Sequence, residues 1–267
     1  MSRAVFGFAA IVMLKNGRPF IGLQDSQKNF GFQDEVFRMG WRRMELLETL
    51  RVWIDRIERA GPEAMAVDEW LLESASTPVL RVYQWLGNWG SVGYFGSLDE
   101  AVTSIPGVQW VRRWTGGGTV DHRADWTYSV IVPSGNALAE LRGADSYRIL
   151  HATLAVALVD EGIDARLSTG NDTTGMALCF QNPVSHDLID SAGRKLAGAG
   201  QRRTRHGLLH QGSVAGKTIG AESRMRAEAL APALARKWES IEYQPPADLI
   251  DRKIADRYGR TEWTLRR

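Results

Sequence analysis

A run of three glycines beside two arginines is the segment of this sequence best suited to binding a reactive group. In order, the segment consists of Arg112, Arg113, Trp114, Thr115, Gly116, Gly117 and Gly118. Consecutive glycines cost backbone entropy, but they permit positive φ and let a ligand approach the main chain closely. Their successive N–H groups can form a concave site for an anion, and the arginines add positive charge beside it. We therefore expect this loop, with His122 shortly after it, to bind a carboxylate, a phosphate or an adenylate; the alternative is a hairpin turn beside two solvated arginines.

A lysine in a glycine-containing, strand-like segment is the second candidate. Lys195 lies between Gly193 and Gly198, where another backbone or a ligand can approach. Its ammonium group is a compact point charge that can neutralise a developing oxyanion or a phosphate. Such a lysine contributes little packing, so its removal is expected to leave folding nearly unchanged. The alternative is a hairpin with a solvated basic face, an interpretation that fits three later arginines better than Lys195: Arg202, Arg203 and Arg205.

The single cysteine, Cys179, limits the chemistry in another way. One cysteine cannot form an internal disulfide or a cysteine-built zinc site. It can be a small buried hydrophobic residue or a reactive nucleophile. The residue type alone leaves both interpretations open.

Length and composition predict an ordinary globular chain. The 267 residues are 44% hydrophobic and 24% charged, enough for one large domain or two small ones with a sizeable core. The formal charge is only +2, which gives no indication of a general nucleic-acid-binding protein. No apolar stretch reaches the ~20 residues that a membrane span needs. The apolar segment 5–14 has no small-residue cleavage site after it, so we expect no secretory signal and a cytoplasmic location.

Blocks of helical and strand periodicity must position these residues. Apolar spacing of three and four residues predicts helices at 35–57, 62–72, 137–162, 224–238 and 247–258. Alternating, β-branched and aromatic segments predict strands at 79–85, 91–95, 108–113, 126–132, 165–168, 188–189, 195–203 and 208–214. Strands and helices in separate blocks predict an α+β fold with a mixed, largely antiparallel sheet packed with helices.

Five ordered motifs resemble the lipoate–protein ligase and octanoyltransferase superfamily, which also includes the biotin ligases. They are Met-Ala-x-Asp-Glu at 65–69, Arg-Arg-x-Thr-Gly-Gly-Gly at 112–118 with the following His122, Thr-Tyr-Ser at 127–129, Gly-x-Lys-x-x-Gly-x-x-Gln-x-Arg at 193–203, and His-x-Gly-Ser at 210–213. Their order and spacing match the superfamily from the first motif to the last. The resemblance therefore implies a biotin/lipoate ligase-like catalytic domain at 49–267 and an N-terminal extension of unassigned role at 1–48.

The resemblance implies an enzyme that transfers a lipoyl or octanoyl group to one lysine of a lipoyl carrier domain. Such carriers are 2-oxoacid dehydrogenase subunits or the glycine-cleavage H protein. The glycine loop, the first helix and the lysine strand would close over the acyl tail, and aromatic residues between 83 and 95 would line it. The catalytic candidates are Lys195 and Cys179. The residues implied in substrate binding are Arg112, Thr115, Gly116, Gly117, Gly118, His122, Asp187 and Gly198.

Within this resemblance two chemistries are open, and the first is an ATP-dependent ligase. A ligase uses ATP and Mg to form an acyl-adenylate, with Lys195 on the carboxyl and phosphate oxygens. The ligases usually carry Asn-Asp before the lysine strand; here the pair is His186 and Asp187, and Asp187 is the implied metal ligand. Many ligases carry an extra C-terminal domain for which this chain has no room, so a separate accessory subunit or a self-sufficient short form is implied. The intact glycine loop and Asp187 make this the preferred interpretation.

The second chemistry is an octanoyltransferase that needs no ATP or other cofactor. One branch of octanoyltransferases has Cys-Phe-x-x-Pro before the lysine strand, and residues 179–183 match it. The Cys179 thiolate would carry the octanoyl group from acyl carrier protein as a thioester, with Lys195 stabilising the thiolate or the oxyanion. A third interpretation is a non-catalytic protein that binds lipoyl domains, although the presence of Lys195 argues against it.

Overall fold

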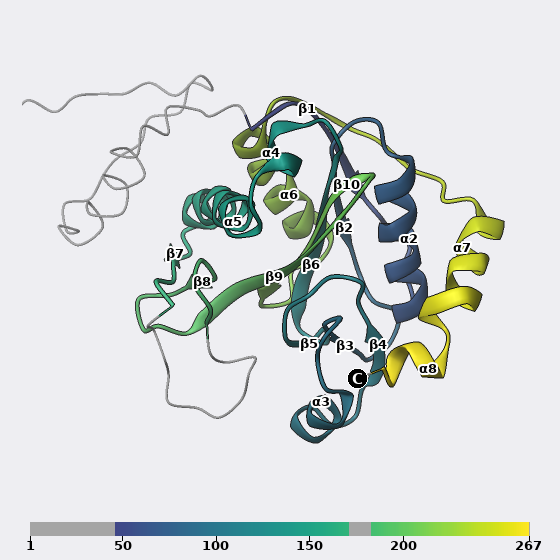
Figure 1. Ribbon diagram of the computed structural model, residues 1–267. Helices are drawn as coiled ribbons and strands as arrows, with labels where there is room; N and C mark the ends of the chain where they lie inside the picture. Colours follow the sequence, from purple (N-terminus) through teal and green to yellow (C-terminus); the bar gives the residue numbers. More distant parts are fainter. Residues whose placement is uncertain (1–45, 171–182, 267) are drawn as a thin grey trace, which may run out of the picture. The chain divides into compact units, whose positions relative to one another are not determined.

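Two sheets and the helices around them make up the described part of the chain (Figure 1). The structure is a computed structural model that describes residues 46–170 and 183–266. The chain divides into two units, Met1–Arg42 and Arg43–Arg267. Both sheets and all the helices described belong to the second unit.

The larger sheet of the described residues has eight strands in the order β11-β1-β2-β6-β10-β9-β8-β7. Their bounds are Leu47–Ile54 (β1), Val79–Tyr83 (β2), Asp125–Pro133 (β6), Arg166–Leu167 (β7), Leu188–Ile189 (β8), Lys195–Thr204 (β9), Gly207–Ala215 (β10) and Ala235–Ser240 (β11). β1 pairs in parallel with β2 and β11, whereas all pairs from β2 to β7 are antiparallel. The sheet is therefore mixed and largely antiparallel, which confirms the predicted α+β class.

A smaller sheet, in the order β4-β3-β5, carries the glycine loop between β4 and β5. Its strands are Trp89–Val92 (β3), Gln109–Arg112 (β4) and Thr119–Asp121 (β5). The helices are Gly61–Ser74 (α2), Leu98–Ser104 (α3), Ala137–Glu140 (α4), Gly143–Asp160 (α5), Gly220–Leu234 (α6), Ala247–Lys253 (α7), the π-helix Ile254–Tyr258 (η1) and Thr261–Thr264 (α8). Figure 1 shows α5 and α6 on one side of the long strands and α2, with α7 outside it, on the other.

Helix α2 forms as its sequence predicts and packs one face of the sheet. Pro62 occupies the first helical turn, where its missing N–H costs nothing, and Glu63 favours the positive end of the helix dipole. Val67 and Leu71 are fully buried in one cluster with Leu209 of β10. Burial of such a side chain contributes about 1.5–3 kcal/mol. The packing fixes α2 beneath the strands that carry the candidate site.

Two of the predicted helices contain strands instead. The prediction at 35–57 is wrong for 47–54, which form β1, and the helix predicted at 224–238 ends at Leu234, where β11 begins with Ala235. β1 and β11 pair with each other, with Leu47 opposite Ala235 and Val52 opposite Ser240. Their apolar residues also fit a helical spacing, and only the pairing of segments far apart in the chain favours the strands.

The helix predicted at 137–162 is two helices. Asn136 caps α4 by accepting a hydrogen bond from the Leu138 N–H (3.0 Å), and α4 ends at Glu140. α5 begins at Gly143 and places two polar aromatic residues against the sheet, Tyr147 at β9 and His151 at β10. The break sets the direction from which α5 approaches the candidate site.

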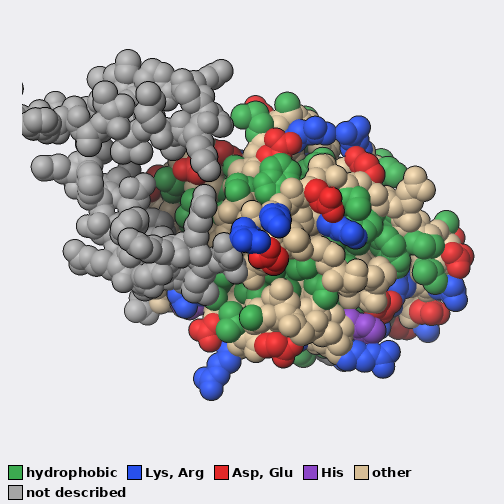
Figure 2. Space-filling model, turned by 90° about the horizontal axis from the view of Figure 1, so that it is seen from above, with side chains coloured by type: hydrophobic (Ala, Val, Ile, Leu, Met, Phe, Trp, Pro, Cys, Tyr) green, Lys and Arg blue, Asp and Glu red, His purple; other side chains and the backbone are tan. Residues whose placement is uncertain are grey.

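Acidic and basic side chains are interspersed on the face shown in Figure 2. This pattern agrees with the formal charge of +2 for the whole chain. In the part of the chain that the structure describes, no helix combines the length and apolar character needed to cross a membrane.

Candidate active site

A cavity of about 380 Å³ is lined by the glycine loop and strand β9. Gly117 and Gly118 line it from the loop, and residues 195–200 line it from the strand. Tyr83 and Trp85 contribute aromatic walls. Its volume lies within the range of about 300–1,000 Å³ that is typical of small-molecule sites.

The structure brings most of the predicted site residues to this cavity. The lining includes Gly117, Gly118, His122, Asp187, Lys195 and Gly198. Arg112, Thr115 and Gly116 are described but do not line it. Phe95, one of the aromatic residues expected to line the acyl tail, is 84% exposed. Cys179 lies outside the described residues.

Lys195 and Asp187 form an ion pair at the cavity wall. Lys195 Nζ lies 2.8 Å from Asp187 Oδ2, and the Asp187 side chain is fully buried. Asp187 immediately precedes β8 and Lys195 begins β9, so the antiparallel pairing of these strands brings the two charges together. The ammonium group is thereby held at one point of the wall, where it can stabilise an oxyanion.

Tyr147, which no sequence motif indicated, holds the same carboxylate from α5. Its hydroxyl donates to Asp187 Oδ1 (2.5 Å) and accepts from the Ala199 N–H (3.0 Å). The Val184 N–H donates to Asp187 Oδ2 (2.9 Å). Burial, and then the Asp187 charge, raise the pKa of Tyr147 well above its usual value. The phenol therefore stays protonated and donates a hydrogen bond to Asp187. The sequence offered only a weak indication of this role: Tyr147 carries a hydroxyl and stands four positions before His151, on the same side of the helix.

His186 explains why the Asn of the superfamily pattern can be replaced here. Its φ is 74°, in the left-handed region where Asn, Asp and His are the most frequent non-glycine residues. The His151 Nδ1–H donates to the His186 carbonyl (2.6 Å). Burial lowers the pKa of His151 to about 4, so this imidazole is neutral at pH 7. The turn that presents Asp187 is therefore fixed from α5.

Gly198 leaves the space that the Lys195 side chain occupies. A Cβ at position 198 would lie 2.6 Å from Lys195 Cε and 2.7 Å from Nζ. Real Cβ atoms do not approach other atoms so closely, so any larger residue would move the amine. The spacing of Lys195 and Gly198 in the sequence thus has a steric reason.

The Gly198→Ala variant is expected to transfer acyl groups about 10–100-fold more slowly, because the new methyl group displaces the ammonium from Asp187. The free energy of unfolding should fall by less than in Lys195→Ala, since the ammonium group is displaced from the buried Asp187 but not removed. Gly143→Ala is the control, because its Cβ would meet nothing closer than Arg203 Nη1 at 3.7 Å. Initial rates and urea unfolding measure both effects; equal rates in the two variants would contradict the role of Gly198.

The glycine loop is held against β9 and β10. The Thr115 hydroxyl donates to Gln211 Oε1 (2.7 Å). A Cβ at Gly200 would lie only 2.2 Å from the Gly116 carbonyl oxygen, so only glycine at position 200 permits this approach. Gly117 has a φ of 92°, which glycine adopts without strain. Thr115 and Gly116 thus position the loop, and Gly117 presents it to the cavity.

The two arginines of the loop bind carbonyl oxygens of the protein. Arg112 is fully buried, and its guanidinium donates to the carbonyls of two segments: Gly93, Tyr94, Gly96, Trp263, Thr264 and Arg266. Arg113 donates to the carbonyls of Gly116 (3.3 Å) and Gly118 (2.8 Å). Burial lowers the pKa of Arg113 to about 10, which leaves it charged at pH 7. This geometry gives no support to the predicted contact of Arg112 with substrate; both side chains shape the loop.

His122 forms part of the cavity wall in a fixed orientation. Its ring stacks on Trp85 with centroids 4.0 Å apart and an interplanar angle of 18°. Ser91 Oγ accepts from Arg113 and lies 2.6 Å from His122 Nε2. The other ring nitrogen, Nδ1, donates to Asp125 Oδ2 (2.8 Å). These contacts fix the orientation of the His122 ring in the cavity wall.

Asp68 of the first motif acts from beneath the loop. Its Oδ1 accepts from the fully buried Arg81 (2.7 Å), and its Oδ2 accepts from Ser129 Oγ (2.6 Å) and Gln211 Nε2 (2.8 Å). Gln211 in turn accepts from Thr115. A continuous hydrogen-bond network therefore connects α2 with the glycine loop.

The Asp68→Ala variant is expected to lose about 3 kcal/mol of stability, because it leaves Arg81 and Gln211 buried with fewer partners. Ser129→Ala, which removes one hydrogen bond of the same network, should cost only about 1 kcal/mol. Urea unfolding of both variants measures the two losses of stability and so checks their ratio. A loss below that of Ser129→Ala would show that Asp68 does not anchor the network.

The contacts of Asp187 do not fit the magnesium-ligand role that the sequence resemblance implied. Mg²⁺ prefers near-octahedral oxygen ligands, whereas both Asp187 oxygens already accept from Tyr147, Val184 and Lys195. Over residues 46–170 and 183–266, no three His, Cys, Asp or Glu side chains gather in a way that could hold a metal ion. The described residues therefore give no support to a Mg²⁺ ion at Asp187.

Comparison with known proteins agrees with the motifs and the fold. The octanoyltransferase LipM of Carboxydothermus hydrogenoformans is 34% identical over 177 residues, which cover 63% of this chain and 65% of that relative, just under two thirds of its length. The solved structure of protein Ta0514 from T. acidophilum with bound lipoic acid has a TM-score of 0.65 at 19% identity, over 82% of this chain and 99% of that chain. The bi-partite lipoate protein ligase from Thermoplasma acidophilum has a TM-score of 0.59 at 18% identity, over 82% and 96% of the two chains.

The solved structures confirm the predicted fold. Residues 61–240 match the sequence model of the family described as the lipoyl protein ligase A/B catalytic domain. This range contains all five motifs and every described residue that lines the cavity. The chain therefore belongs to the lipoyl protein ligase A/B catalytic domain family.

Proposed function

We propose that this protein is an octanoyltransferase that moves an octanoyl group from a thioester donor to a lysine of a lipoyl carrier domain without ATP. The observation that carries the proposal is the Lys195 ammonium group, held 2.8 Å from the buried Asp187 at the cavity wall. Such a cation suits the oxyanion of a thioester, and the carboxylate that a magnesium nucleotide would need is already bound. The name of the LipM relative supports the same activity.

The proposed reaction consists of two acyl transfers. The Cys179 thiolate attacks the donor thioester, a C–S bond to Cys179 forms, and the donor sulfur leaves and takes up the proton that Cys179 released. The neutral ε-amine of the carrier lysine then attacks this thioester, an amide bond forms, the C–S bond to Cys179 breaks, and a proton of the amine returns to the Cys179 sulfur. Lys195 donates to the carbonyl oxygen in both steps. The assignment of Cys179 depends on the sequence pattern at 179–183.

An ATP-dependent ligase, the interpretation preferred from the sequence, is the second candidate. The glycine loop beside Lys195 would suit an acyl-phosphate as well as a thioester. In that case ATP and Mg would be required, and an accessory subunit would be a further expected partner. A non-catalytic protein that binds lipoyl domains is the third candidate.

One experiment separates the three functions. Apo lipoyl domain is incubated with the protein and octanoyl acyl carrier protein in one tube, and with octanoate or lipoate and Mg·ATP in another, and its mass is measured. A gain of one octanoyl group in the first tube alone supports the proposal. A gain only with Mg·ATP overturns it in favour of the ligase, and no gain in either tube, with the lipoyl domain still bound, indicates the binding protein.

A further inference from the structure

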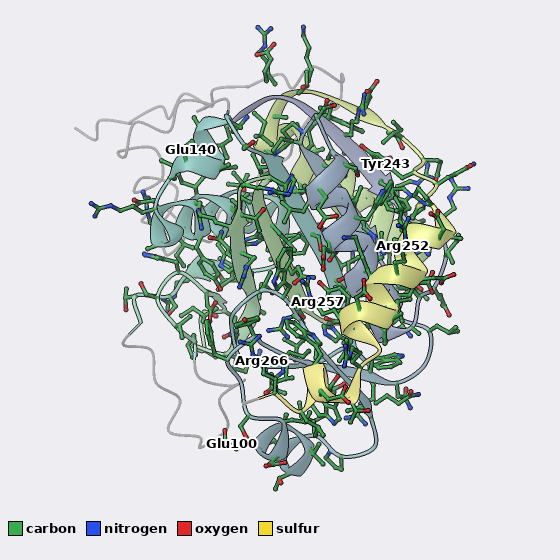
Figure 3. The ribbon with its side chains drawn as sticks, turned by 45° about the vertical axis from the view of Figure 1, so that its right-hand side comes forward. Glu100, Glu140, Tyr243, Arg252, Arg257 and Arg266 are labelled. Atoms are coloured by element: carbon green, nitrogen blue, oxygen red, sulfur yellow. The ribbon has the colours of Figure 1, made fainter. Side chains whose placement is uncertain are left out.

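Three arginines stack on two aromatic rings beside the glycine loop. Arg257 lies over Trp114 (4.6 Å from guanidinium carbon to ring centroid). Arg202 lies over both Trp114 (4.9 Å) and Tyr94 (5.0 Å), and Arg266 lies over Tyr94 (4.3 Å). These distances are within the range of cation–π attraction. Figure 3 shows Arg257 and Arg266 on the same C-terminal segment. The stack fixes guanidinium groups from β9 and from the C-terminal segment in one place.

Two of these cations carry charge that no described carboxylate balances. Arg257 is paired with Glu69. Over residues 46–170 and 183–266, no Asp or Glu oxygen lies within ion-pair distance of Arg202, which is half-buried, or of Arg266, which is exposed. Stacking uses the flat faces of a guanidinium and leaves its N–H edges directed outward for a planar or tetrahedral anion. Arg202 and Arg266 are therefore preorganised donors.

The stack and Lys195 lie at opposite ends of the glycine loop. Successive side chains of a strand point to opposite faces, so Gly198, Gly200 and Arg202 share one face of β9. At a rise of about 3.4 Å per residue, Arg202 lies about 14 Å along the strand from Gly198. The loop runs beside this stretch, with Trp114 against Arg202 and the Gly116 carbonyl against Gly200. Gly200 is the last residue of β9 that lines the cavity, and Arg202 lies two residues beyond it, outside the cavity.

We propose that Arg202 and Arg266 form a subsite for the phosphate of a phosphopantetheine-linked acyl donor. This inference rests on the proposed function, since it requires a thioester donor. The pantetheine arm separates its thioester from its phosphate by a chain long enough to follow the loop from Lys195 to Arg202. Paired arginine N–H groups match phosphate oxygens in charge and geometry. Carrier protein and coenzyme A share this arm and phosphate, so either can supply the ligand.

The test is a binding measurement with non-reactive thioethers: S-octyl-pantetheine, its 4′-phosphate and S-octyl-coenzyme A, titrated into the full chain by calorimetry. The wild type is expected to bind the two phosphorylated probes about tenfold more tightly than S-octyl-pantetheine. Arg202→Ala and Arg266→Ala should each remove most of this preference. Arg202→Lys, which keeps the charge but not the stacked fork, should keep part of it. The exposed Arg252, paired with Asp248 on α7 (Figure 3), supplies the control Arg252→Ala, which should bind like the wild type.

Equal affinity of the wild type for the probes with and without phosphate would overturn the subsite, as would an unchanged preference in Arg266→Ala, whose exposed side chain can be removed without disturbing the core. Michaelis constants separate the two sources. A rise with Arg202→Ala for both octanoyl carrier protein and octanoyl-coenzyme A supports phosphate recognition. A rise for the carrier protein alone would mean that these arginines contact its protein surface, which contradicts the proposal. If no thioester is turned over, the proposed function fails, and the calorimetric preference still decides the subsite.

Discussion

The Lys195→Ala variant is expected to transfer acyl groups about 10²–10³-fold more slowly than the wild type. Removing one preorganised donor from an oxyanion site has an effect of this size, because water replaces it poorly in a closed cavity. Lys195→Arg should recover little of the rate, since the fork of an arginine does not fit the space over Gly198 that holds a single ammonium. Single-turnover rates with octanoyl acyl carrier protein measure the loss. Transfer at the wild-type rate would refute the mechanism.

The same substitution is also expected to destabilise the protein, and here the sequence-based expectation of nearly unchanged folding needs correction. Lys195 is the charged partner of the fully buried Asp187. Removing one member of a buried pair leaves an uncompensated charge, which typically costs about 3–5 kcal/mol. The hydrogen bonds from Tyr147 and Val184 remain, so we expect the loss to lie at the lower end of this range or below it.

The Lys195→Ala/Asp187→Asn double variant is the control for that loss. It removes both charges, so urea unfolding should show much of the lost stability restored. Its rate of acyl transfer should stay as low as that of Lys195→Ala. This separation of stability from rate would show that the slow transfer comes from the missing ammonium and not from unfolding.

The Cys179→Ala variant is expected to lose transfer from octanoyl thioesters by more than about 10⁴-fold, because the covalent route has no other nucleophile. Cys179 is the single cysteine of the chain, so an octanoyl adduct on the wild type can be assigned without mapping. Incubation with octanoyl acyl carrier protein should produce a hydroxylamine-sensitive mass gain in the wild type and none in Cys179→Ala.

The alternatives give different results with the same variant. A ligase would keep its Mg·ATP-dependent rate in Cys179→Ala, since its intermediate is an adenylate. A wild-type rate from the thioester donor without a cysteine would contradict the proposed octanoyltransferase. Alkylation of the wild type with iodoacetamide should reproduce the effect of the substitution, and prior incubation with octanoyl donor should protect against it.

Local sequence predicted best those elements whose own residues decide their structure. Strand β9 was predicted at 195–203 and α2 at 62–72, and both are confirmed within a few residues. In α2 the first-turn proline and the apolar spacing agree, and in β9 the glycines leave room for the loop and for Lys195. β1 and β11 were missed because their strand structure depends on pairing with each other, and the two segments come from opposite ends of the domain.

The sequence by itself determined the family, the α+β class and two segments of the cavity wall, because the glycine loop and Lys195 are recognisable by residue type and spacing. Only the tertiary structure decided what each polar group binds. Arg112 could donate to a ligand or to the backbone, and its burial beside the C-terminal carbonyls selected the backbone. Tyr147 gained its role when α5 reached Asp187. Hydrogen bonds and ion pairs act over a few ångströms, so their partners follow from which distant segments the fold brings together.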